Sequence, residues 1–314
     1  MMAGVVALVA AAGCSGDGSG SESTSGSGSV DSIMLRAMCE FDQRCRPFDF
    51  LQFGDVEHCV QRLRLFGDLP FHSPGMRITK DQANACADAM RAARCDEKTE
   101  LENGGVCMFR GTVENGKACL WEYQCASGYC TRRGDFECGV CATPAVEGEV
   151  CEDGECLRNT SCREYQDSPP ICYKYDVQLG ETCNPKPPDY IYCEIGARCV
   201  EHVCVALARV GEECEWSDDC DGLSYCDQPS YSEKGVCRAV VMRGVGEDCD
   251  YDENYCGPRL YCDENEKCKA YVADGAVCDY ENDECMEPFV CAPDGASSGT
   301  SRCQNVTKFV AKCE

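Results

Sequence analysis

The sequence predicts a small disulfide-rich fold, in which an array of six short β-hairpin modules follows a small α-helical domain. Three observations lead to this prediction. Cysteine accounts for 33 of the 314 residues, a density typical of disulfide scaffolds. One cysteine pattern recurs through the C-terminal two thirds of the chain, as expected of a repeat array. The preceding segments instead space their apolar residues as amphipathic helices do.

The composition favours several small units over one large domain. Apolar residues make up 44% of the chain, but without the cysteines they fall to about a third of it. A single domain of about 300 residues normally has a large apolar core. Smaller units need disulfides, a metal or oligomerisation to stay folded. Because disulfides persist in oxidising compartments, the cysteines indicate an exported protein.

Residues 1–13 are predicted to be a signal peptide of the lipoprotein type, with Cys14 as the lipidated residue. The short apolar run MAGVVALVAAAGC resembles the end of bacterial lipoprotein signal peptides, in which a peptidase cuts before a cysteine that is then diacylated. Ala11 stands where leucine is commoner. No basic residue precedes the run, so we expect the natural start to lie upstream of Met1. The alternative is an ordinary secretory signal, with Cys14 as one more disulfide partner.

The odd number of cysteines agrees with lipidation. An unpaired cysteine in a secreted protein needs an explanation, and lipid on Cys14 would leave 32 cysteines for disulfides. Residues 14–31 would then be the lipidated cysteine and a flexible Ser/Gly tether. No later segment has the ~20 consecutive apolar residues of a membrane span. We therefore expect a cell-envelope lipoprotein, in the outer membrane or at the cell surface, held to the membrane by its N-terminal lipid.

Residues 32–107 are predicted to form a disulfide-bonded domain of three helices. Apolar residues in the segment 33–45 have helical spacing. Asp55 is a candidate N-cap for the second helix. Thr79 and Gln82 form a capping-box pattern at the start of the third. Six cysteines of this domain are expected to form three disulfides whose pairing cannot be read from the sequence: Cys39, Cys45, Cys59, Cys86, Cys95 and Cys107.

Residues 108–314 are predicted to contain the six repeats, each opening with the pattern Gly-x-x-Cys. The cysteines of this pattern recur at intervals of 29 to 35 residues. We expect a turn at each opening glycine. The predicted repeats span about 116–144, 148–175, 180–207, 211–240, 246–271 and 275–314.

Each repeat is assigned four disulfide-forming cysteines. Four cysteines allow three pairings, of which we favour first-to-third with second-to-fourth. Loops rich in Asp, Asn and Gly between the third and fourth cysteines predict a β-hairpin. Cys141 and Cys313 are left outside this assignment. The assigned cysteines are Cys119, Cys125, Cys130 and Cys138; Cys151, Cys156, Cys162 and Cys172; Cys183, Cys193, Cys199 and Cys204; Cys214, Cys220, Cys226 and Cys237; Cys249, Cys256, Cys262 and Cys268; and Cys278, Cys285, Cys291 and Cys303.

Disulfides explain how so short a unit can be stable. A segment of about 32 residues cannot bury enough apolar surface to offset its conformational entropy. Closing a loop of ~15 residues with a disulfide destabilises the unfolded chain by about 3 kcal/mol in the entropy model. Two disulfides in a repeat are therefore enough to stabilise it with little core.

The repeats resemble a known cysteine-rich module. The stretches GEECEWSDDCDGLSYCDQPSYSEKGVC and GEDCDYDENYCGPRLYCDENEKC are similar to the repeat of the Dickkopf N-terminal region. CMFRGTVENGKACLWEYQCASGYC, residues 107–130, resembles the junction in predicted bacterial lipoproteins that combine a cysteine-bearing helical head with such repeats. The resemblance covers residues 32–314. It implies the architecture and little about activity, because cysteine spacing reflects disulfide bonding rather than ligand contacts.

The sequence does not favour a metal or other cofactor. Zinc sites usually show paired Cys-x₂₋₄-Cys motifs, often with histidine, and this chain has one Cys-x-x-Cys, at Cys138 and Cys141, and three histidines in all. Asp248, Asp250 and Asp252 alternate as at the start of an EF-hand loop and are weak calcium candidates. Glu253 and Arg259 stand where that loop needs a glycine and a bidentate acid. We expect a solvated acidic surface, with calcium binding as the alternative.

Charge and motifs exclude several functions. The net charge is −26, most of it on the repeats, which argues against a nucleic-acid partner. The sequence has no nucleophile elbow, zinc-protease motif or phosphate loop. The three histidines are His58, His72 and His202. We therefore expect no enzymatic activity.

The expected function is that of an envelope-anchored binding or adhesion-type protein. An extended, rigid array would present loops to an unknown protein or glycan partner. Aromatic residues in loops favour this interpretation: Trp121, Trp216, Tyr231 and Tyr251. The alternatives are a structural spacer or coat protein without a discrete ligand, and a secreted protease inhibitor.

Overall fold

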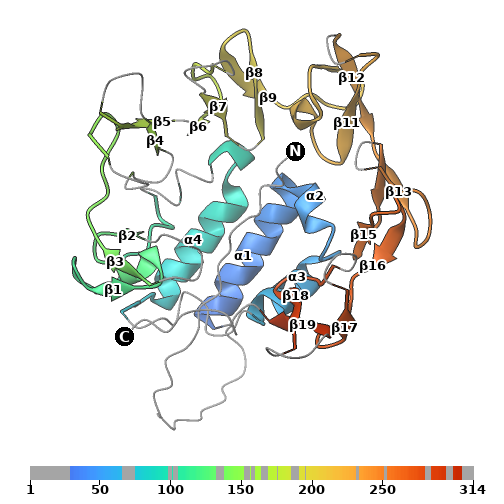
Figure 1. The fold of residues 1–314 in the computed structure, drawn as a ribbon. Coiled ribbons are helices and arrows are strands. Elements are labelled where there is room, and N and C mark those ends of the chain that lie inside the picture. Colours follow the sequence, from blue (N-terminus) through green and yellow to red (C-terminus); the bar gives the residue numbers. More distant parts are fainter. Residues whose placement is uncertain are drawn as a thin grey trace.

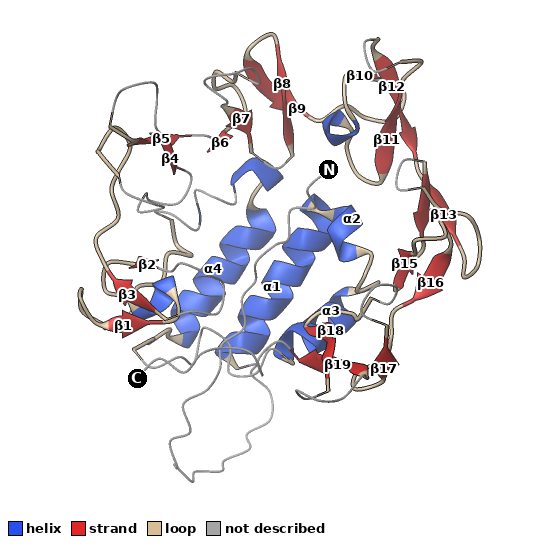
Figure 2. Ribbon diagram, viewed as in Figure 1, coloured by secondary structure: helices blue, strands red, loops and turns tan. Residues whose placement is uncertain are grey.

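The structure, a computed structural model, places helices at the centre and short β-sheets around them (Figure 1). Figure 2 shows the sheets following one another in an arc along the chain. The predicted fold class is confirmed, but the array curves around the helices and is not an extended rod. The described residues are 29–65, 75–97, 101, 105–131, 138–151, 156, 160–163, 169–174, 176–184, 191–194, 196–230, 233–250, 253–279, 284–294 and 300–305.

The helical domain contains the three predicted helices and a short additional one. They are α1 (Val30–Cys45), α2 (Pro47–Phe50), α3 (Val56–Arg64) and α4 (Lys80–Ala92), followed by the 3₁₀ helix η2 (Cys95–Glu97). Both predicted caps are confirmed. The Asp55 carboxylate accepts a hydrogen bond from the His58 backbone N–H at 2.8 Å. Thr79 and Gln82 form the reciprocal capping box of α4. Helix α1 begins at Val30, two residues before the expected boundary.

Helix α1 packs on both sides, and the core therefore has two halves. On one side, Leu35 and Cys39 of α1 meet Val60 and Leu63 of α3. On the other side, α1 residues meet the predicted apolar face of α4, whose members are all buried: Ala83, Cys86, Ala87 and Met90.

Three disulfides hold this domain together, as predicted. Cys39–Cys59 joins α1 to α3, and Cys45–Cys95 joins the end of α1 to η2. Cys86–Cys107 joins α4 to the segment that leads into the repeats. Helices α1, α3, α4 and η2 are therefore each cross-linked to another part of the domain, whereas α2 contains no cysteine.

The repeats consist of very short strands, grouped into sheets of two or three. Repeat 1 contains β1 (Ala118–Cys119), β2 (Cys130–Thr131) and β3 (Gly139–Cys141); repeat 2 contains β4 (Thr160–Arg163) and β5 (Ile171–Lys174); repeat 3 contains β6 (Asp176–Val177), β7 (Tyr192–Cys193), β8 (Ala197–Val200) and β9 (Val203–Ala206); repeat 4 contains β10 (Glu213–Cys214), β11 (Ser224–Asp227) and β12 (Gly235–Ala239); repeat 5 contains β13 (Val241–Arg243), β14 (Asn254–Cys256), β15 (Leu260–Cys262) and β16 (Cys268–Ala270); and repeat 6 contains β17 (Val277–Cys278), β18 (Phe289–Pro293) and β19 (Ser301–Asn305). Figure 1 labels most of these strands.

The predicted hairpin between the third and fourth cysteines is present in all six repeats. These two cysteines lie directly opposite each other on antiparallel strands: Cys130↔Cys141, Cys162↔Cys172, Cys199↔Cys204, Cys226↔Cys237, Cys262↔Cys268 and Cys291↔Cys303. They are not bonded to each other. The disulfides instead tie each strand to the segment before the hairpin.

The favoured pairing is confirmed. The first cysteine bonds the third in Cys119–Cys130, Cys151–Cys162, Cys183–Cys199, Cys214–Cys226, Cys249–Cys262 and Cys278–Cys291. The second bonds the fourth in Cys125–Cys141, Cys156–Cys172, Cys193–Cys204, Cys220–Cys237, Cys256–Cys268 and Cys285–Cys303. Buried cysteines make up most of the apolar clusters inside the repeats.

One cysteine assignment was wrong. The fourth cysteine of repeat 1 is Cys141, which bonds Cys125 and lies opposite Cys130 in the hairpin. Cys138 is also disulfide-bonded, but it lies outside the pattern that the six repeats share. Cys313 and Cys14 lie outside the described residues.

The predicted turn at the opening glycine is confirmed. Gly211, for example, has φ +93°, and nothing lies within 4 Å of the position a Cβ would take. Glycine is therefore required by the backbone conformation and not by lack of space. The Gly211 N–H donates to the Cys237 carbonyl at 2.8 Å, and the Cys237 N–H donates back to the Glu212 carbonyl at 2.9 Å. Equivalent bonds recur in the other five repeats.

Each repeat begins three residues before its glycine. A residue six positions before the first cysteine pairs, in parallel, with the second cysteine. These pairs are Val113↔Cys125, Ala145↔Cys156, Val177↔Cys193, Ala208↔Cys220, Arg243↔Cys256 and Val272↔Cys285. The shared structure is thus slightly longer than the repeat predicted from the sequence.

Arg62 of α3 joins repeat 6 to the helical domain. Its buried guanidinium donates to both carboxylate oxygens of Asp274 at 2.7 and 2.8 Å. It also donates to the carbonyls of Met286 and Glu287 and lies 5.1 Å from the centre of the Phe289 ring. One side chain therefore satisfies several polar groups of repeat 6 at once.

Repeat 5 contacts the helical domain beside this point. Arg259 pairs with Asp55 at 2.8 Å and donates to the Phe53 carbonyl at 3.2 Å. The Phe48 ring of α2 packs against Tyr255 with 4.5 Å between ring centroids. The last two repeats are thus fixed to α2, α3 and the loop between them.

Repeats 1 and 3 contact the opposite side of the helical domain. Val113 of repeat 1 lies so close to Gly75 that an added Cβ at Gly75 would stand 2.6 Å from a Val113 methyl carbon. The Thr112 N–H, just before repeat 1, donates to the Gly75 carbonyl at 2.8 Å. Gly196 of repeat 3 lies so close to Cys95 that an added Cβ would stand 2.5 Å from the Cys95 Cβ. Contacts from four repeats therefore explain why the array follows the helices.

We predict that Arg62→Met weakens the attachment of repeat 6. The carbonyls and the carboxylate that Arg62 satisfies would lose their donor, at a cost of about 2–3 kcal/mol. Hydrogen exchange of the repeat 6 amides, with native disulfides intact, measures this loss.

Arg302→Met is the matched control, because the exposed Arg302 makes its ion pair with Asp294 and its hydrogen bond to the Gly275 carbonyl inside repeat 6 and not to the helical domain. It should change protection by less than about 1 kcal/mol. Equal effects of the two substitutions would contradict the role given to Arg62.

Candidate functional site

Among the described residues, groups of candidate metal ligands include sulfur atoms inside the repeats. In repeat 1, the sulfurs of Cys119, Cys125 and Cys130 lie within 4.8 Å of one another, and similar groups occur in four other repeats. Each of these sulfurs already belongs to a disulfide. A disulfide sulfur is not a thiolate, and the thiolate is the form that binds zinc. These groups are therefore neighbouring disulfides.

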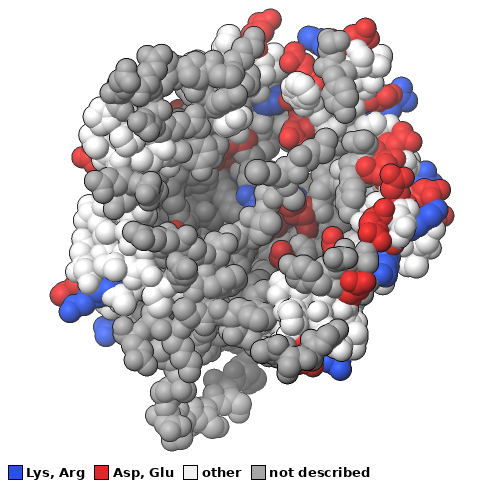
Figure 3. All heavy atoms as spheres, in the orientation of Figure 1, with Lys and Arg blue, Asp and Glu red and all other residues white. Residues whose placement is uncertain are grey.

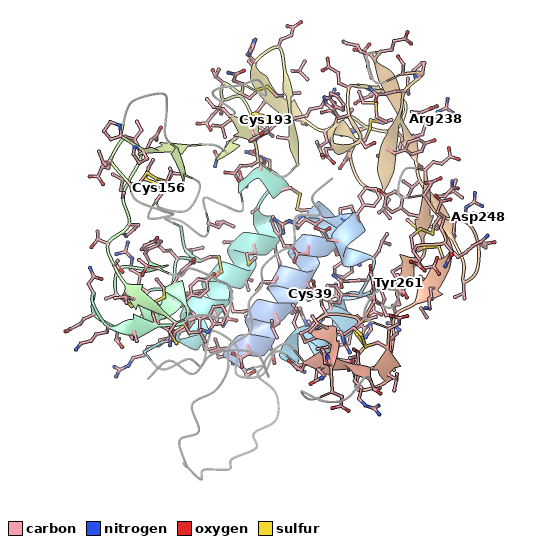
Figure 4. The ribbon with its side chains drawn as sticks, viewed as in Figure 1. Cys39, Cys156, Cys193, Arg238, Asp248 and Tyr261 are labelled. Atoms are coloured by element: carbon pink, nitrogen blue, oxygen red, sulfur yellow. A yellow bond between two sulfur atoms is a disulfide. The ribbon has the colours of Figure 1, made fainter. Side chains whose placement is uncertain are left out.

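The two calcium candidates that the structure describes, Asp248 and Asp250, are bound by other groups of the protein. Asp248 lies on the outer side of repeat 5 (Figure 4) and pairs with Lys267. Its pKa is lowered, first by the hydrogen bond from Lys267 and then by the lysine charge. Asp250 accepts hydrogen bonds from the N–H groups of Glu253 and Asn254 at 2.9 Å. Asp252 lies outside the described residues.

Part of the acidity of the repeats has a structural role. In four repeats, the glutamate after the opening glycine accepts a hydrogen bond from the N–H three residues earlier, at 2.6 to 3.0 Å. These residues are Glu149, Glu181, Glu212 and Glu247. Their carboxylates hold the opening turn closed, which the interpretation as a simply solvated surface did not include.

The histidines show no catalytic arrangement in the described part of the chain. His58 Nδ1 lies 2.8 Å from the Phe53 carbonyl oxygen. His202 is exposed at a hairpin turn, with φ 66°. His72 lies outside the described residues. Neither described histidine has a hydrogen bond from its imidazole ring to a hydroxyl, thiol or carboxylate, as a nucleophile–base pair would require.

Two carboxylates where repeats 5 and 6 meet the helical domain have raised pKa values. Their surroundings therefore disfavour the charged form. Burial raises the pKa of Asp49 in α2, although Arg46 opposes the change. Burial also raises the pKa of Glu287 in repeat 6, and the charge of Asp49 raises it further. Glu284 shows the same effect of burial. The negative charges of Asp49 and Glu287 therefore repel each other close to the point where Arg62 binds repeat 6.

The carboxylate that attaches repeat 3 to the helical domain has a lowered pKa instead. Asp96 is buried, which alone would raise its pKa. Hydrogen bonds from the Arg94 guanidinium and the Leu179 N–H, together with the arginine charge, outweigh burial and lower the pKa. The anion of Asp96 is thus favoured, and it binds repeat 3 to η2.

The aromatic residues expected in exposed loops differ in burial. Trp216 in repeat 4 is 56% exposed, as expected, whereas Trp121 at the equivalent place in repeat 1 is buried, with 4% exposed. Each lies two residues after the first cysteine of its repeat. Tyr231 and Tyr251 lie outside the described residues. The expectation was therefore wrong for Trp121 and is confirmed for Trp216.

Repeat 4 also differs in what surrounds its tryptophan. Glu213 pairs with Lys234. Glu213, Glu215 and Glu201 all raise the pKa of Lys234, with Glu213 the largest cause. Arg198 of repeat 3 donates to the Glu213 carbonyl at 2.7 Å. The surface around Trp216 is thus built from two adjacent repeats and is rich in carboxylates.

No model of a known protein family matches the chain, and no solved structure matches it. Within the described ranges, no helix has the length and hydrophobicity needed to cross a membrane. The many disulfides indicate an oxidising compartment outside the cytoplasm.

We predict that the attachment of repeat 6 weakens as the pH rises. Because the pKa values of Asp49 and Glu287 are raised in the folded chain, the attached state binds protons that the detached state releases. The contribution is fully present below their ordinary values of 3.8 and 4.5 and is lost as the pH rises through the raised values. Hydrogen exchange of repeat 6 across this range, corrected for intrinsic exchange, measures it.

The double variant Asp49→Asn, Glu287→Gln should show a flatter pH profile and stronger protection of repeat 6 at neutral pH. Glu264→Gln, on an exposed turn of repeat 5, is the control. Indistinguishable profiles for the double variant and the native chain would rule out this explanation.

Proposed function

We propose that this protein is a non-enzymatic binding protein of the cell envelope, anchored by lipid on Cys14, whose repeats present a recognition surface. Trp216 is the observation that carries the proposal. An exposed tryptophan on a stable scaffold is a common feature of binding surfaces, where tryptophan is enriched.

The scaffold supports this proposal. Disulfides and turn hydrogen bonds hold each repeat, and four repeats are also bound to the helical domain. Little conformational entropy is then lost when a partner binds, which favours affinity. The surface is thus organised before the partner arrives.

Trp121 provides an internal comparison. The two tryptophans occupy equivalent positions, and both are followed by a short 3₁₀ helix, η3 (Glu122–Gln124) and η4 (Ser217–Asp219). The repeat fold accommodates this residue whether it is buried or exposed. Exposure of Trp216 is therefore not imposed by the fold, and recognition of a partner accounts for it better than a purely structural spacer does.

We predict that the native protein captures one reproducible partner from the envelope extract of its own cell. Capture should be lost when the disulfides are reduced and alkylated, because the surface then loses its shape. Mass spectrometry of the captured material is the measurement. A spacer would capture nothing specific, and a protease inhibitor would capture a protease whose activity falls in the complex. Equal capture by native and reduced chains would contradict the proposal.

We predict that Cys14 carries a diacylglycerol group in protein purified from the cell envelope. The lipid would hold the protein in the membrane fraction, and Cys14→Ser would release it. Intact mass and peptide mapping of the mature N-terminus are the measurements. A mature chain with Cys14 in a disulfide would show an ordinary secretory signal instead.

A further inference from the structure

We propose that the surface around Trp216, on repeats 3 and 4, binds a lysine- or arginine-bearing segment of a partner protein. This inference rests on the proposed function and specifies the partner's chemistry. It is carried by an exposed indole ring in a strongly acidic repeat, next to the place where β8 of repeat 3 contacts η4.

The charge of repeat 4 matches a cationic partner. Residues 211–237 contain eight acidic residues and one lysine, a net charge of −7. Residues 116–141, the equivalent part of repeat 1, contain three acidic and three basic residues and are neutral. The exposed tryptophan thus belongs to a strongly acidic repeat and the buried one to a neutral repeat.

Several of these carboxylates lie near Trp216 in the chain, and β8 of repeat 3 contacts η4, the short helix that follows Trp216. Glu213 and Glu215 precede the ring in the chain, and Asp218 follows it, all three exposed. Glu201, at the turn of the β8–β9 hairpin, acts on the same lysine as Glu213 and Glu215. The Asp219 carboxylate accepts hydrogen bonds from the N–H groups of Glu215 and Trp216 at 2.8 and 3.0 Å. With Asp219, five carboxylates stand against two cations, Lys234 and Arg198, so the net charge of these residues is −3. A cationic side chain would therefore be attracted to the ring from either repeat.

The apolar part of the surface is open. Val236 lies opposite Glu213 on adjacent strands and is 43% exposed, so the two side chains share one face of the sheet. Among the described residues, no ring or cation packs on the Trp216 indole. An indole face attracts a guanidinium or ammonium group within about 6 Å of its centroid, and carboxylates beside it add charge-assisted hydrogen bonds.

Repeat 4 is also well placed for contact with another molecule. Its described hydrogen bonds to its neighbours go to repeats 3 and 5, through Arg198 and Tyr225. Figure 3 shows acidic side chains gathered along the edge of the molecule where Figure 1 places β12, β13 and β16, with basic side chains between them. A glycan could stack on the indole, but the excess of carboxylates favours a cation.

The test uses the full chain with native disulfides and a labelled nonapeptide of alternating arginine and glycine. Fluorescence anisotropy should show binding that weakens from about 0.05 M to about 0.5 M NaCl, because salt screens exposed charges. Trp216→Ala should weaken binding about two- to fivefold, the range of exposed cation–π contacts. Trp216→Phe should restore part of the loss, and Glu215→Gln should weaken binding as well.

Glu264→Gln on acidic repeat 5 is the control for general charge attraction and should leave binding unchanged. A peptide of alternating glutamate and glycine should not bind. The inference is overturned if Trp216→Ala binds the arginine peptide as tightly as the native chain, or if Trp216 binds a glycan in a salt-independent way. In either case, if the native chain still captured a partner, the proposed binding function would be supported without this inference. If the native chain captured no partner at all, both the proposed function and this inference would be wrong.

Discussion

The pair of crossed disulfides in each repeat is the interaction on which the rest of the structure depends. The third and fourth cysteines lie opposite each other in a hairpin but are bonded to the first and second. Each strand is therefore fixed to the segment before the hairpin, and the sulfur atoms fill the interior of the repeat. Strands of two residues, which could not persist by hydrogen bonding alone, are stable because the unfolded chain is constrained.

Because the interior of each repeat consists of disulfides, its other side chains are available for different tasks. Glu212 and its equivalents close the opening turn. Arg259 of repeat 5 and the acceptors of Arg62 in repeat 6 attach the array to the helices. Trp216 on repeat 4 stays exposed. The same scaffold thus serves in repeats that attach to the helices and in a repeat with an exposed tryptophan. A few side chains outside the cysteine pattern decide which role a repeat has.

Local features could be predicted from the sequence, and long-range contacts could not. The caps at Asp55 and Thr79, the hairpins and the disulfide pairing depend on residues close together in the chain. Cys141 was misassigned because the gap between the third and fourth cysteines varies, and only the strand register distinguishes it from Cys138. Arg62 and Asp274 are 212 positions apart, and no sequence pattern connects them. The curvature of the array follows from such contacts.

Mapping the disulfides of the native protein tests the central claim most directly. Proteolysis without reduction, followed by mass spectrometry, should recover Cys214–Cys226 with Cys220–Cys237 and the corresponding pairs of the other repeats, and almost no free thiol. Most sulfurs found reduced, or Cys226 found bonded to Cys237 across the hairpin, would show that crossed disulfides do not hold the repeats together.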